Sequence, residues 1–444
     1  MDAFKLRDRI IQEYKHYVTS FIRIQDRRIA RKVNDTINRG LLWPDPLIQI
    51  NPFFESGESI NDFVQKEILH PLCEQIFADK RKQPIKPLQL YRHQSEAIKA
   101  AATGANYVLT TGTGSGKSLA YIIPIVNYVL RNPEQRGIKA IIVYPLNALA
   151  NSQLGELDRF INTGFPDRRG PVRFARYTGQ ENDEQKNEII ADPPDILLTN
   201  YVMLELIMTR PKERKLINAA SGLQFLVLDE LHTYRGRQGA DVALLVRRAR
   251  EYFNAPDLQM VGTSATLAGP GSLASQKKEV ASVASRLFGS PVKPEHVIGE
   301  TLKRITPEVD IEAEEFRNSL KHVIESDMPY PLSFNEFISD PRAIWLESVF
   351  GVTRSEEGHL VRVKPRSIRG GSGVASELSA ITELGKDESS KMIQDGLRSG
   401  NTCETSPHTD KPPFAFRVHQ FISPSETVFT TLEKPNDRKI TLSG

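Results

Sequence analysis

The chain has 444 residues, of which 39% are hydrophobic and 25% charged, and its formal net charge is +3. This is the composition of an ordinary globular protein, and the length suggests two or three domains. The bulk charge does not indicate nucleic-acid binding, so any basic surface must be local. The two cysteines, Cys73 and Cys403, lack CxxC spacing. This argues against a disulfide framework or a Cys-based zinc site and favours a reducing, cytoplasmic location. No apolar run approaches about 18 residues, so no membrane span is expected.

Residues 1–84 are predicted to form a helical N-terminal region. Over residues 3–39, apolar side chains recur at steps of three and four, which predicts an amphipathic helix or a helix pair closed by Gly40. The polar face is basic, and two interpretations of it stay open: a solvated surface packed on the main domain, or a contact for nucleic acid or a partner. Ser59 is expected to cap a further helix, with one side formed by Phe63, Ile68, Leu72 and Ile76.

Residues 85–295 show a different pattern, in which short apolar runs alternate with helical stretches. The strand-like runs are NYVLT (106–110), KAIIVYP (139–145), VRFARYT (172–178), DILLTN (195–200), FLVLDE (225–230) and LQMVGTS (258–264). Apolar strands that are each followed by a helix predict an α/β fold, with a parallel sheet covered by helices on both faces. Ligands of such a sheet gather beyond the carboxyl ends of its strands.

Residues 296–444 are expected to form an accessory region, because the alternating pattern weakens there. Within it, residues 372–400 are predicted to form a helix, a Gly-containing turn and a second helix. This arrangement is similar to a winged-helix or helix-turn-helix unit. Such a unit either binds nucleic acid or packs against its neighbours, and the sequence favours neither.

A glycine-rich loop follows the first strand, in the stretch YVLTTGTGSGKSLAY at 107–121. Glycines between a strand and a helix let backbone N–H groups converge on phosphate oxygens, and the helix N-terminus adds its dipole. Lys117 would pair with the β- and γ-phosphates of ATP, and the Ser118 hydroxyl would bind Mg²⁺. The strict P-loop has glycine where Thr111 stands. A glycine loop without a ligand is the alternative, and the strand–loop–helix context argues against it.

An acidic pair ends another strand, in FLVLDELH at 225–232. Asp229 is expected to bind Mg²⁺ through its water shell, and Glu230 to act as a base or to position the attacking water. A solvent-facing acidic pair at a strand end is the alternative. Four apolar residues directly before the pair, together with the upstream loop, argue against it.

With these two motifs, the sequence resembles the first RecA-like motor domain of superfamily 2 helicases, in the DExH-box (DEAD/DEAH) group. The family's first motif often reads A-x-T-G-x-G-K-T, and TGTGSGKS at 111–118 fits it with threonine in the alanine place. The resemblance implies that Gln94 pairs with the adenine edge and that Tyr91 stacks on the base. The implied ATP site consists of Tyr91, Gln94, Thr111, Gly112, Thr113, Gly114, Ser115, Gly116, Lys117 and Ser118.

Further motifs follow in the family's order. DELH at 229–232 resembles the second motif, and GTSATL at 262–267 resembles the third. The resemblance implies that Ser264 and Thr266 join the ATP site to the nucleic-acid site. His232 would contact the third motif or a partner domain, and a packed core histidine is the alternative.

Strand-end loops at 143–153, 177–180 and 193–205 resemble the motifs that hold the phosphate backbone of one nucleic-acid strand. The residues expected along this path are Pro145, Asn147, Thr178, Gly179 and Asn200. Arg235, in the RGRQG loop, is either a DNA contact or part of a basic turn. The stretch 229–248 is similar to large bacterial helicases of repair and phage-defence systems, which implies DNA rather than RNA and 3′-to-5′ translocation.

A second RecA-like domain is expected to be absent, because no Q-x-x-G-R-x-G-R pattern follows residue 270. The resemblance then implies a truncated product, a fragment, or a split subunit whose other lobe comes from a second polypeptide. An arginine finger contributes on the order of 10³ to 10⁵ in turnover, so the chain alone is expected to bind ATP but hydrolyse it slowly. Two other functions stay open: a nucleotide-gated nucleic-acid-binding or assembly module without motor activity, and an RNA helicase.

Overall fold

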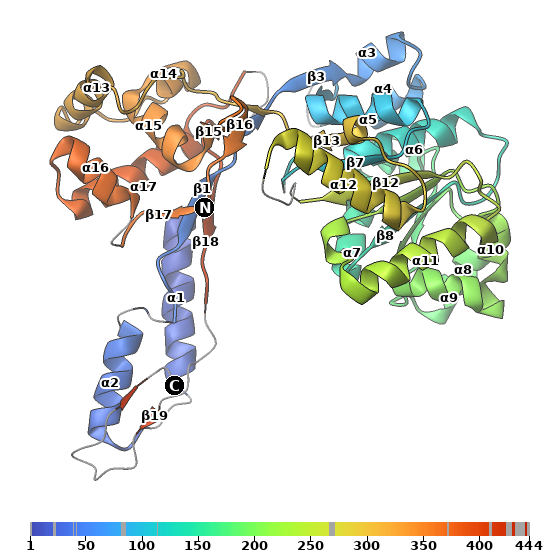
Figure 1. Ribbon diagram of the computed structural model, residues 1–444, viewed down its shortest axis with the longest axis horizontal. Helices are drawn as coiled ribbons and strands as arrows, with labels where there is room; N and C mark the ends of the chain where they lie inside the picture. Colours follow the sequence, from blue (N-terminus) through green and yellow to red (C-terminus); the bar gives the residue numbers. More distant parts are fainter. Residues whose placement is uncertain are drawn as a thin grey trace. The chain divides into compact units, whose positions relative to one another are not determined.

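The chain forms two compact units in a computed structural model, and unit 2 contains the motifs described above. The structure describes residues 2–20, 24–38, 40, 42–80, 86–112, 114–265, 271–370, 373–407, 411–422, 429–430 and 440–441. Unit 1 combines Met1–Phe53 with Leu302–Gly444, and unit 2 is Phe54–Thr301 (Figure 1). This division differs from the three consecutive regions expected at 1–84, 85–295 and 296–444. The first and last segments belong together in unit 1, and residues 54–80 belong with the sheet in unit 2.

Unit 2 is built on a seven-stranded sheet with the order β13-β7-β12-β11-β8-β10-β9, in which every neighbouring pair is parallel. Its strands are β7 (Tyr107–Thr110), β8 (Ala140–Tyr144), β9 (Phe174–Arg176), β10 (Ile196–Asn200), β11 (Phe225–Leu228), β12 (Gln259–Ser264) and β13 (Val297–Gly299). The predicted α/β fold class with a parallel sheet is confirmed. All six strands predicted from the sequence are present, and the three-residue β13 is an addition at the edge beside β7.

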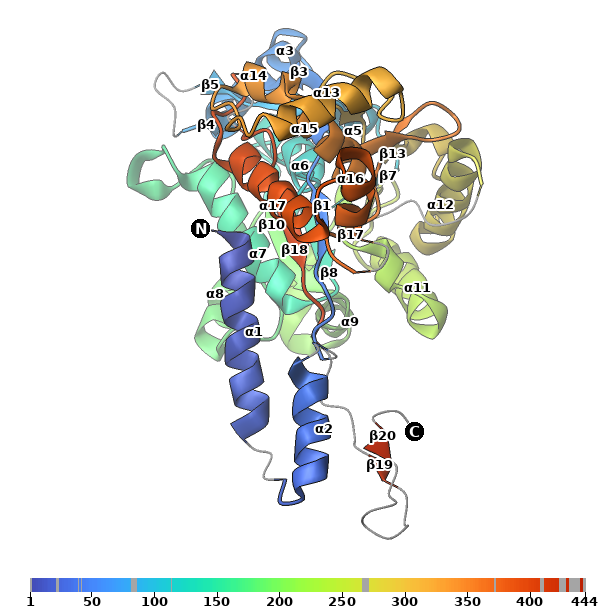
Figure 2. The ribbon, with the colours of Figure 1, turned by 90° about the vertical axis from the view of Figure 1, so that its left-hand side faces the viewer.

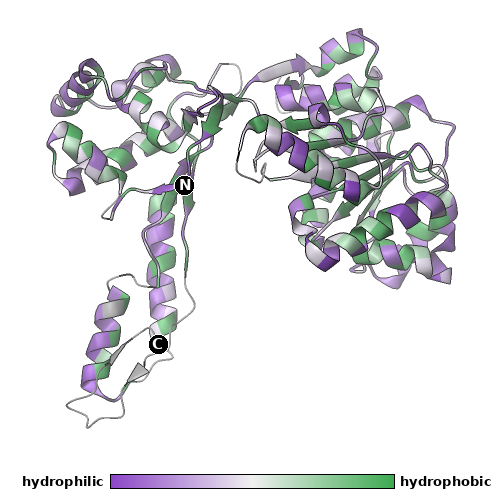
Figure 3. Ribbon diagram, in the orientation of Figure 1, coloured by the Kyte–Doolittle hydropathy of each residue, from purple (hydrophilic) through white to green (hydrophobic). Residues whose placement is uncertain are grey.

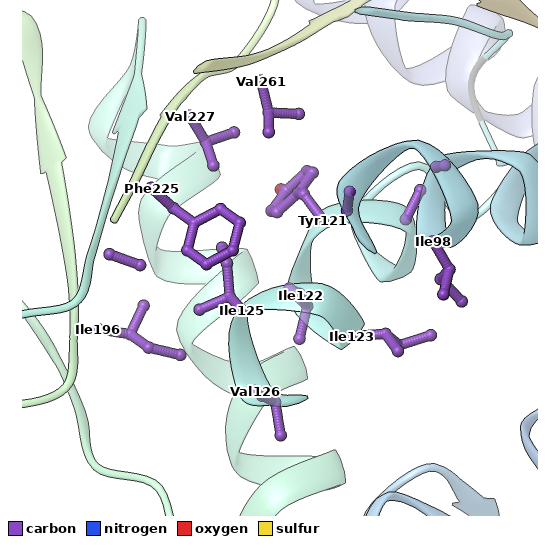
Figure 4. Packing of buried hydrophobic residues seen from close by; sticks show 14 of the residues in the cluster. Ile98, Tyr121, Ile122, Ile123, Ile125, Val126, Ile196, Phe225, Val227 and Val261 are labelled. Atoms are coloured by element: carbon purple, nitrogen blue, oxygen red, sulfur yellow. The ribbon is translucent and has the colours of Figure 1, made fainter. Parts of the chain in front are cut away.

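Helices cover both faces of this sheet, and alternate strand residues serve the two faces. Along β8, Ile142 packs in the first core and Ile141 in the second. The first face is covered by α5 (Arg92–Ala102), α6 (Leu119–Arg131) and α7 (Asn147–Leu157). The second is covered by α9 (Tyr201–Thr209), α10 (Arg214–Ala219), α11 (Gly236–Tyr252) and α12 (Leu273–Phe288). Figure 4 shows Ile125 of α6 pointing toward Phe225 of β11, and the strands form the hydrophobic centre of the unit (Figure 3).

The segment before the sheet forms short elements, of which α3, α4 and β6 contribute to the first core. They are β3 (Ser56–Ser59), α3 (Ile60–Gln65), α4 (Leu72–Ile76), β4 (Ala78–Asp79), β5 (Lys86–Pro87) and β6 (Gln89–Tyr91). Helix α8 (Asp183–Ala191) follows β9 and packs its Ile190 in the second core. Ser59 caps α3 as predicted, since its side chain accepts from the N–H of Asp62 and Asp62 bonds back to Ser59. The expected single helix as far as Ile76 is wrong. Glu67 has a left-handed φ of 58°, and Pro71 lacks the N–H that a continuous helix needs.

Unit 1 contains the predicted N-terminal helix pair, α1 (Ala3–Ser20) and α2 (Arg27–Asn38), which lie side by side (Figure 2). Strand β1 (Leu47–Ile50) pairs antiparallel with β17 (Arg366–Ser367) and β18 (Phe416–His419). The remaining helices are α13 (Glu314–Glu325), α14 (Phe334–Ser339), α15 (Pro341–Phe350), α16 (Val374–Thr382) and α17 (Lys386–Thr402). The short strands are β2 (Phe53–Phe54), β14 (Leu302–Lys303), β15 (Val352–Arg354), β16 (Leu360–Arg362), β19 (Phe429–Thr430) and β20 (Ile440–Thr441).

The helix–turn–helix predicted at 372–400 is present as α16 and α17. Leu378 of α16 and Ile393 and Leu397 of α17 are fully buried around Trp345 in the core of unit 1. This packing gives the pair a structural role, and a role in binding nucleic acid stays a prediction. Among the residues that the structure describes, no helix combines the length and the apolar character that crossing a bilayer requires.

The buried strand β8 allows a test of the sheet. Ile142 has no exposed surface and lies between β11 and β10. Truncation by Ile142→Ala is expected to lower the free energy of unfolding by about 2–5 kcal/mol, because it removes buried methyl groups and leaves a cavity. The measurement is urea denaturation followed by far-UV circular dichroism. Leu244→Ala is the control, since Leu244 on α11 is 61% exposed and should change stability by no more than about 0.5 kcal/mol. Equal effects of the two changes would contradict the buried position of β8.

Candidate nucleotide and nucleic-acid site

The glycine-rich loop lies at the carboxyl end of β7 and leads directly into α6. Gly114 and Gly116 have left-handed φ values of 83° and 69°, which side chains with a Cβ rarely adopt. A Cβ on Gly116 would also come within 2.7 Å of the amide nitrogen of Gln94. Thr111 and Ser115 are fully buried, and their hydroxyl oxygens lie 2.7 Å apart. The loop therefore has the tight, glycine-dependent backbone that is typical of a phosphate cradle.

Two side chains of helix α5 form hydrogen bonds with backbone carbonyls of this loop. The imidazole Nε2 of His93 lies 2.9 Å from the carbonyl oxygen of Ser115, and the Gln94 side-chain amide donates to the carbonyl of Gly116 at 2.9 Å. Burial lowers the pKa of His93, which favours its neutral form. His93 was not among the predicted site residues. Its place directly before Gln94 was the available signal.

Gln94 and Tyr91 lie beside the cradle, but the amide of Gln94 is already engaged. Its oxygen accepts from the backbone N–H of Tyr91 at 2.9 Å, and its nitrogen is bonded to Gly116. One N–H and one lone pair of a side chain that is only 3% exposed are left for a nucleobase. These are the one donor and one acceptor that bidentate pairing with adenine needs.

A cavity of about 470 Å³ adjoins the loop, and Tyr91, Gln94, Gly114, Gly116 and Leu119 line it. Both residues expected to bind the base and two glycines of the loop thus line one cavity. A larger cavity of about 810 Å³ lies at the amino ends of the strands, beside the buried Lys139–Asp195 ion pair. Ligands of parallel sheets bind at the other edge, so the smaller cavity is the candidate nucleotide site.

The acidic pair lies at the end of β11, and Thr263 of the neighbouring strand β12 holds it in place. The Thr263 hydroxyl donates to a carboxylate oxygen of Asp229 at 2.5 Å and accepts from the backbone N–H of Glu230 at 3.0 Å. The pKa of Asp229 is raised, chiefly by burial and further by the charge of Glu230, although the Thr263 bond and Lys117 oppose the shift. Thr263 was not among the predicted site residues, although it directly precedes Ser264, which was predicted to join the two sites.

Glu230 joins the acidic pair to the cradle. One of its carboxylate oxygens lies 3.3 Å from the ammonium of Lys117, and the other lies 3.2 Å from Nδ1 of His232. Nδ1 of His232 is also 3.5 Å from the hydroxyl of Ser264. Glu230 has a left-handed φ of 53°, which is uncommon for a residue with a side chain and is a strained conformation that active sites often hold.

Two further carboxylates contact the cradle. Glu300, just after β13, accepts from the backbone N–H of Gly112 at 3.0 Å, and Glu156 of α7 accepts from the Ser118 hydroxyl at 2.9 Å. Both glutamates lie outside the motifs from which the site was predicted. Two predicted residues, Thr113 of the loop and Thr266 of the third motif, lie outside the residues that the structure describes.

Three of the residues expected along the nucleic-acid path share hydrogen bonds at the same edge of the sheet. The side-chain amide of Asn200 donates to the side-chain oxygen of Asn147 at 2.8 Å and to the carbonyl of Thr178 at 3.1 Å. Pro145 is partly buried just after β8, and Arg235 is exposed immediately before α11. The structure thus brings Asn147, Thr178 and Asn200 together from three different strand ends.

The buried carboxylate of Glu181, which was not among the predicted site residues, binds backbone groups of the loop at 177–180. Glu181 accepts from the backbone N–H of Thr178 at 2.8 Å and of Gly179 at 2.9 Å, and it also accepts from the side chain of Arg176 at 2.6 Å. Burial opposes ionisation, but these donors keep the pKa of Glu181 below its usual range. A phosphate cannot take the two N–H groups while Glu181 holds them. The T-x-x-E spacing, which is that of a capping box, was the available signal.

Comparisons with known proteins agree with the motifs. Residues 91–272 match the model of the DEAD/DEAH box helicase family. The resemblance to superfamily 2 helicases is therefore confirmed for this segment, which lies within unit 2.

Individual relatives match over part of their length. The chain is 32% identical over 190 residues to the uncharacterized ATP-dependent helicase YprA of Bacillus subtilis (strain 168), covering 42% of this chain and 24% of YprA. It is 24% identical over 356 residues to the Druantia protein DruE of Escherichia coli (strain UMEA 4076-1), covering 55% of this chain and 19% of DruE. The crystal structure of the DUF1998 helicase MrfA bound to DNA aligns with a TM-score of 0.45 at 26% identity, over 56% of this chain and 30% of MrfA. The chain thus spans about a quarter or less of these two curated relatives.

The raised pKa of Asp229 predicts a cost of ionising this carboxylate in the folded, unliganded chain. The cost is present above the raised pKa and absent below the ordinary pKa of aspartate, about 3.9, where both states are protonated. Asp229→Asn is therefore expected to raise the melting temperature of the unliganded chain at pH 7 by about 2–4 °C, as a change of about 1 kcal/mol does. The gain should shrink as the pH approaches 4. The control is Asp241→Asn, at an exposed position on α11, and a lower melting temperature for Asp229→Asn at pH 7 would contradict the prediction.

Proposed function

We propose that this chain contributes the ATP-binding half of an ATP-dependent nucleic-acid helicase or translocase. The observation that carries the proposal is the meeting of two motifs at one edge of the sheet. Lys117 of the cradle lies 3.3 Å from Glu230 of the acidic pair, although the two residues belong to different strand–loop units. A phosphate cradle, a metal-binding aspartate and a water-positioning glutamate in one place constitute the machinery for phosphoryl transfer to water.

The proposed roles follow from this geometry. Lys117 leaves Glu230 to pair with the β- and γ-phosphates, and the loop N–H groups bind the phosphate oxygens. Glu230 is then released to orient the attacking water and to accept its proton. The base would occupy the cavity beside Tyr91 and Gln94. His232 and Ser264 lie beside Glu230, where they would connect the nucleotide site with the nucleic-acid path.

Mg²⁺ is the metal that suits the proposed site. The Ser118 hydroxyl and the Asp229 carboxylate are both oxygen donors, and Mg²⁺ prefers oxygen ligands and retains several waters. When bound, it would neutralise the charge that develops between the β- and γ-phosphates. This chain's own residues hold the donor atoms in place, through the bonds of Ser118 to Glu156 and of Asp229 to Thr263.

We propose DNA as the preferred nucleic acid, on the resemblance of residues 229–248 to large bacterial DNA helicases. Its backbone would pass the cluster of Asn147, Thr178 and Asn200, with Pro145, Gly179 and Arg235 along the same path. The side-chain amide of Asn147, whose oxygen accepts from Asn200, would donate to its phosphates in place of the N–H groups held by Glu181.

The cradle is tested by two substitutions. Lys117→Ala is expected to weaken the binding of a fluorescent ATP analogue by on the order of 100-fold, since the bonds lost are to charged phosphates. Glu230→Gln should retain binding but reduce turnover by about 10²–10⁴, because it removes the proton acceptor. Binding is measured separately from turnover, since turnover also depends on an arginine supplied in cis or in trans. Lys278→Ala, at an exposed position on α12, is the control. Unchanged binding in a folded Lys117→Ala protein would disprove the assignment.

The nucleic-acid preference is tested by the stimulation of ATP turnover. Single-stranded DNA is expected to stimulate more than RNA of the same sequence, and excess RNA should not displace labelled DNA. Asn200→Ala is expected to weaken DNA binding by about 10-fold, because one or two hydrogen bonds that position the cluster are lost. Stronger stimulation by RNA would favour an RNA helicase. ATP binding without stimulation by either would favour a nucleotide-gated binding or assembly module.

A further inference from the structure

Glu156 has no place in the motifs, yet its side chain reaches the hydroxyl that is proposed to bind the metal. Its carboxylate oxygen accepts from the Ser118 hydroxyl at 2.9 Å. The two residues are 38 positions apart in the sequence. Helix α7 carries Glu156 in its last turn, and its first residue is Asn147 of the proposed nucleic-acid path.

The direction of this hydrogen bond determines where the lone pairs of Ser118 point. A hydroxyl has one proton and two lone pairs, and it rotates about its C–O bond to suit its partners. A carboxylate accepts, so the proton of Ser118 is directed toward Glu156. The lone pairs are thereby directed away from Glu156 and are left for a cation. Mg²⁺ demands near-ideal octahedral geometry, so a hydroxyl with a fixed orientation is a better ligand than one that rotates freely.

The surroundings of Glu156 leave its carboxylate available for this role. Its side chain is 33% exposed, and its ion pair with Arg159, one turn further along the chain, is long at 3.7 Å. Glu156 also lines the cavity of about 470 Å³ together with Gln94, Gly114 and Gly116. Asp229, the other proposed metal ligand, has its own partner in the hydroxyl of Thr263 at 2.5 Å.

We propose that Glu156 is a positioning residue for the magnesium ion of the nucleotide site. It accepts the proton of Ser118, and so it aims the lone pairs of that hydroxyl at the metal. This inference rests on the proposed function, because it requires that Ser118 and Asp229 hold Mg²⁺ with ATP. It assigns to α7 a contribution to metal binding in addition to its contribution to the nucleic-acid path.

The test separates metal affinity from nucleotide affinity. A fluorescent ADP or ATP analogue is titrated into the full chain with EDTA, and then at fixed nucleotide with increasing Mg²⁺. Glu156→Ala is expected to leave the metal-free nucleotide affinity at least as strong as in the wild type. It should raise the Mg²⁺ concentration needed for half-maximal effect by about 10–100-fold, as losses of hydrogen-bond partners to metal ligands do. Glu156→Gln should show a smaller rise, because a neutral oxygen accepts more weakly than a carboxylate.

The control is Glu188→Gln, which removes a carboxylate at an exposed position on α8 and should leave both affinities unchanged. Three outcomes would overturn the inference: an unaltered Mg²⁺ dependence in Glu156→Ala, a parallel fall of metal-free and metal-dependent affinity, or a gain in Mg²⁺ affinity. The last would mean that Glu156 competes with the metal for Ser118. If the wild-type chain binds nucleotide with no effect of Mg²⁺, the proposed function fails instead, so the two failures are distinguishable.

Discussion

The parallel pairing of seven strands is the constraint on which the site depends. Because every neighbouring pair runs in the same direction, all carboxyl ends meet at one edge, where the peptide groups and side chains after each strand converge. Lys117 after β7, Glu230 after β11 and Asn200 at the end of β10 come from distant parts of the sequence and lie at this edge. The buried apolar strands fix the positions of these polar groups without taking part in the chemistry.

Most of the sheet could be predicted because a strand that is buried on both faces is apolar at nearly every residue. β8 and β11 have that character throughout, whereas β7 ends in one polar residue and β10 in two. β13 escaped prediction because three residues, one of them glycine, are too few to form a pattern. The interruption between α3 and α4 escaped for another reason. Glu67 adopts a left-handed conformation where backbone N–H groups of Ile68 and Leu69 close α3 on the carbonyl of Phe63, and glutamate itself favours a helix.

Site residues could be predicted where a short local motif indicates their chemistry. Residues whose role depends on contacts between distant parts of the chain could not be predicted. Lys117 and Asp229 follow from a glycine-rich loop and from an acidic pair directly after an apolar strand. Thr263, Glu156 and Glu181 each act through hydrogen bonds to groups that packing brings near them. A threonine or glutamate in a strand end or helix has many ordinary uses, so its residue type alone carries little information. The Thr178–Glu181 spacing was a local signal, but capping boxes are common at loops that bind nothing.

The unfavourable features of the unliganded chain gather at the candidate site. Asp229 is a buried carboxylate whose ionisation is disfavoured, and Glu230 beside it combines a second charge with a left-handed backbone, which costs about 1–3 kcal/mol. The ammonium of Lys117, 3.3 Å from a carboxylate oxygen of Glu230, offsets part of the repulsion between Asp229 and Glu230. The pairing of β11 with β12 and β8 keeps the two carboxylates together despite the rest of this repulsion. A cation beside Asp229 would remove the repulsion directly and free Lys117 for phosphate. Under the proposed function, the charge repulsion at this site would therefore favour the joint binding of Mg²⁺ and nucleotide.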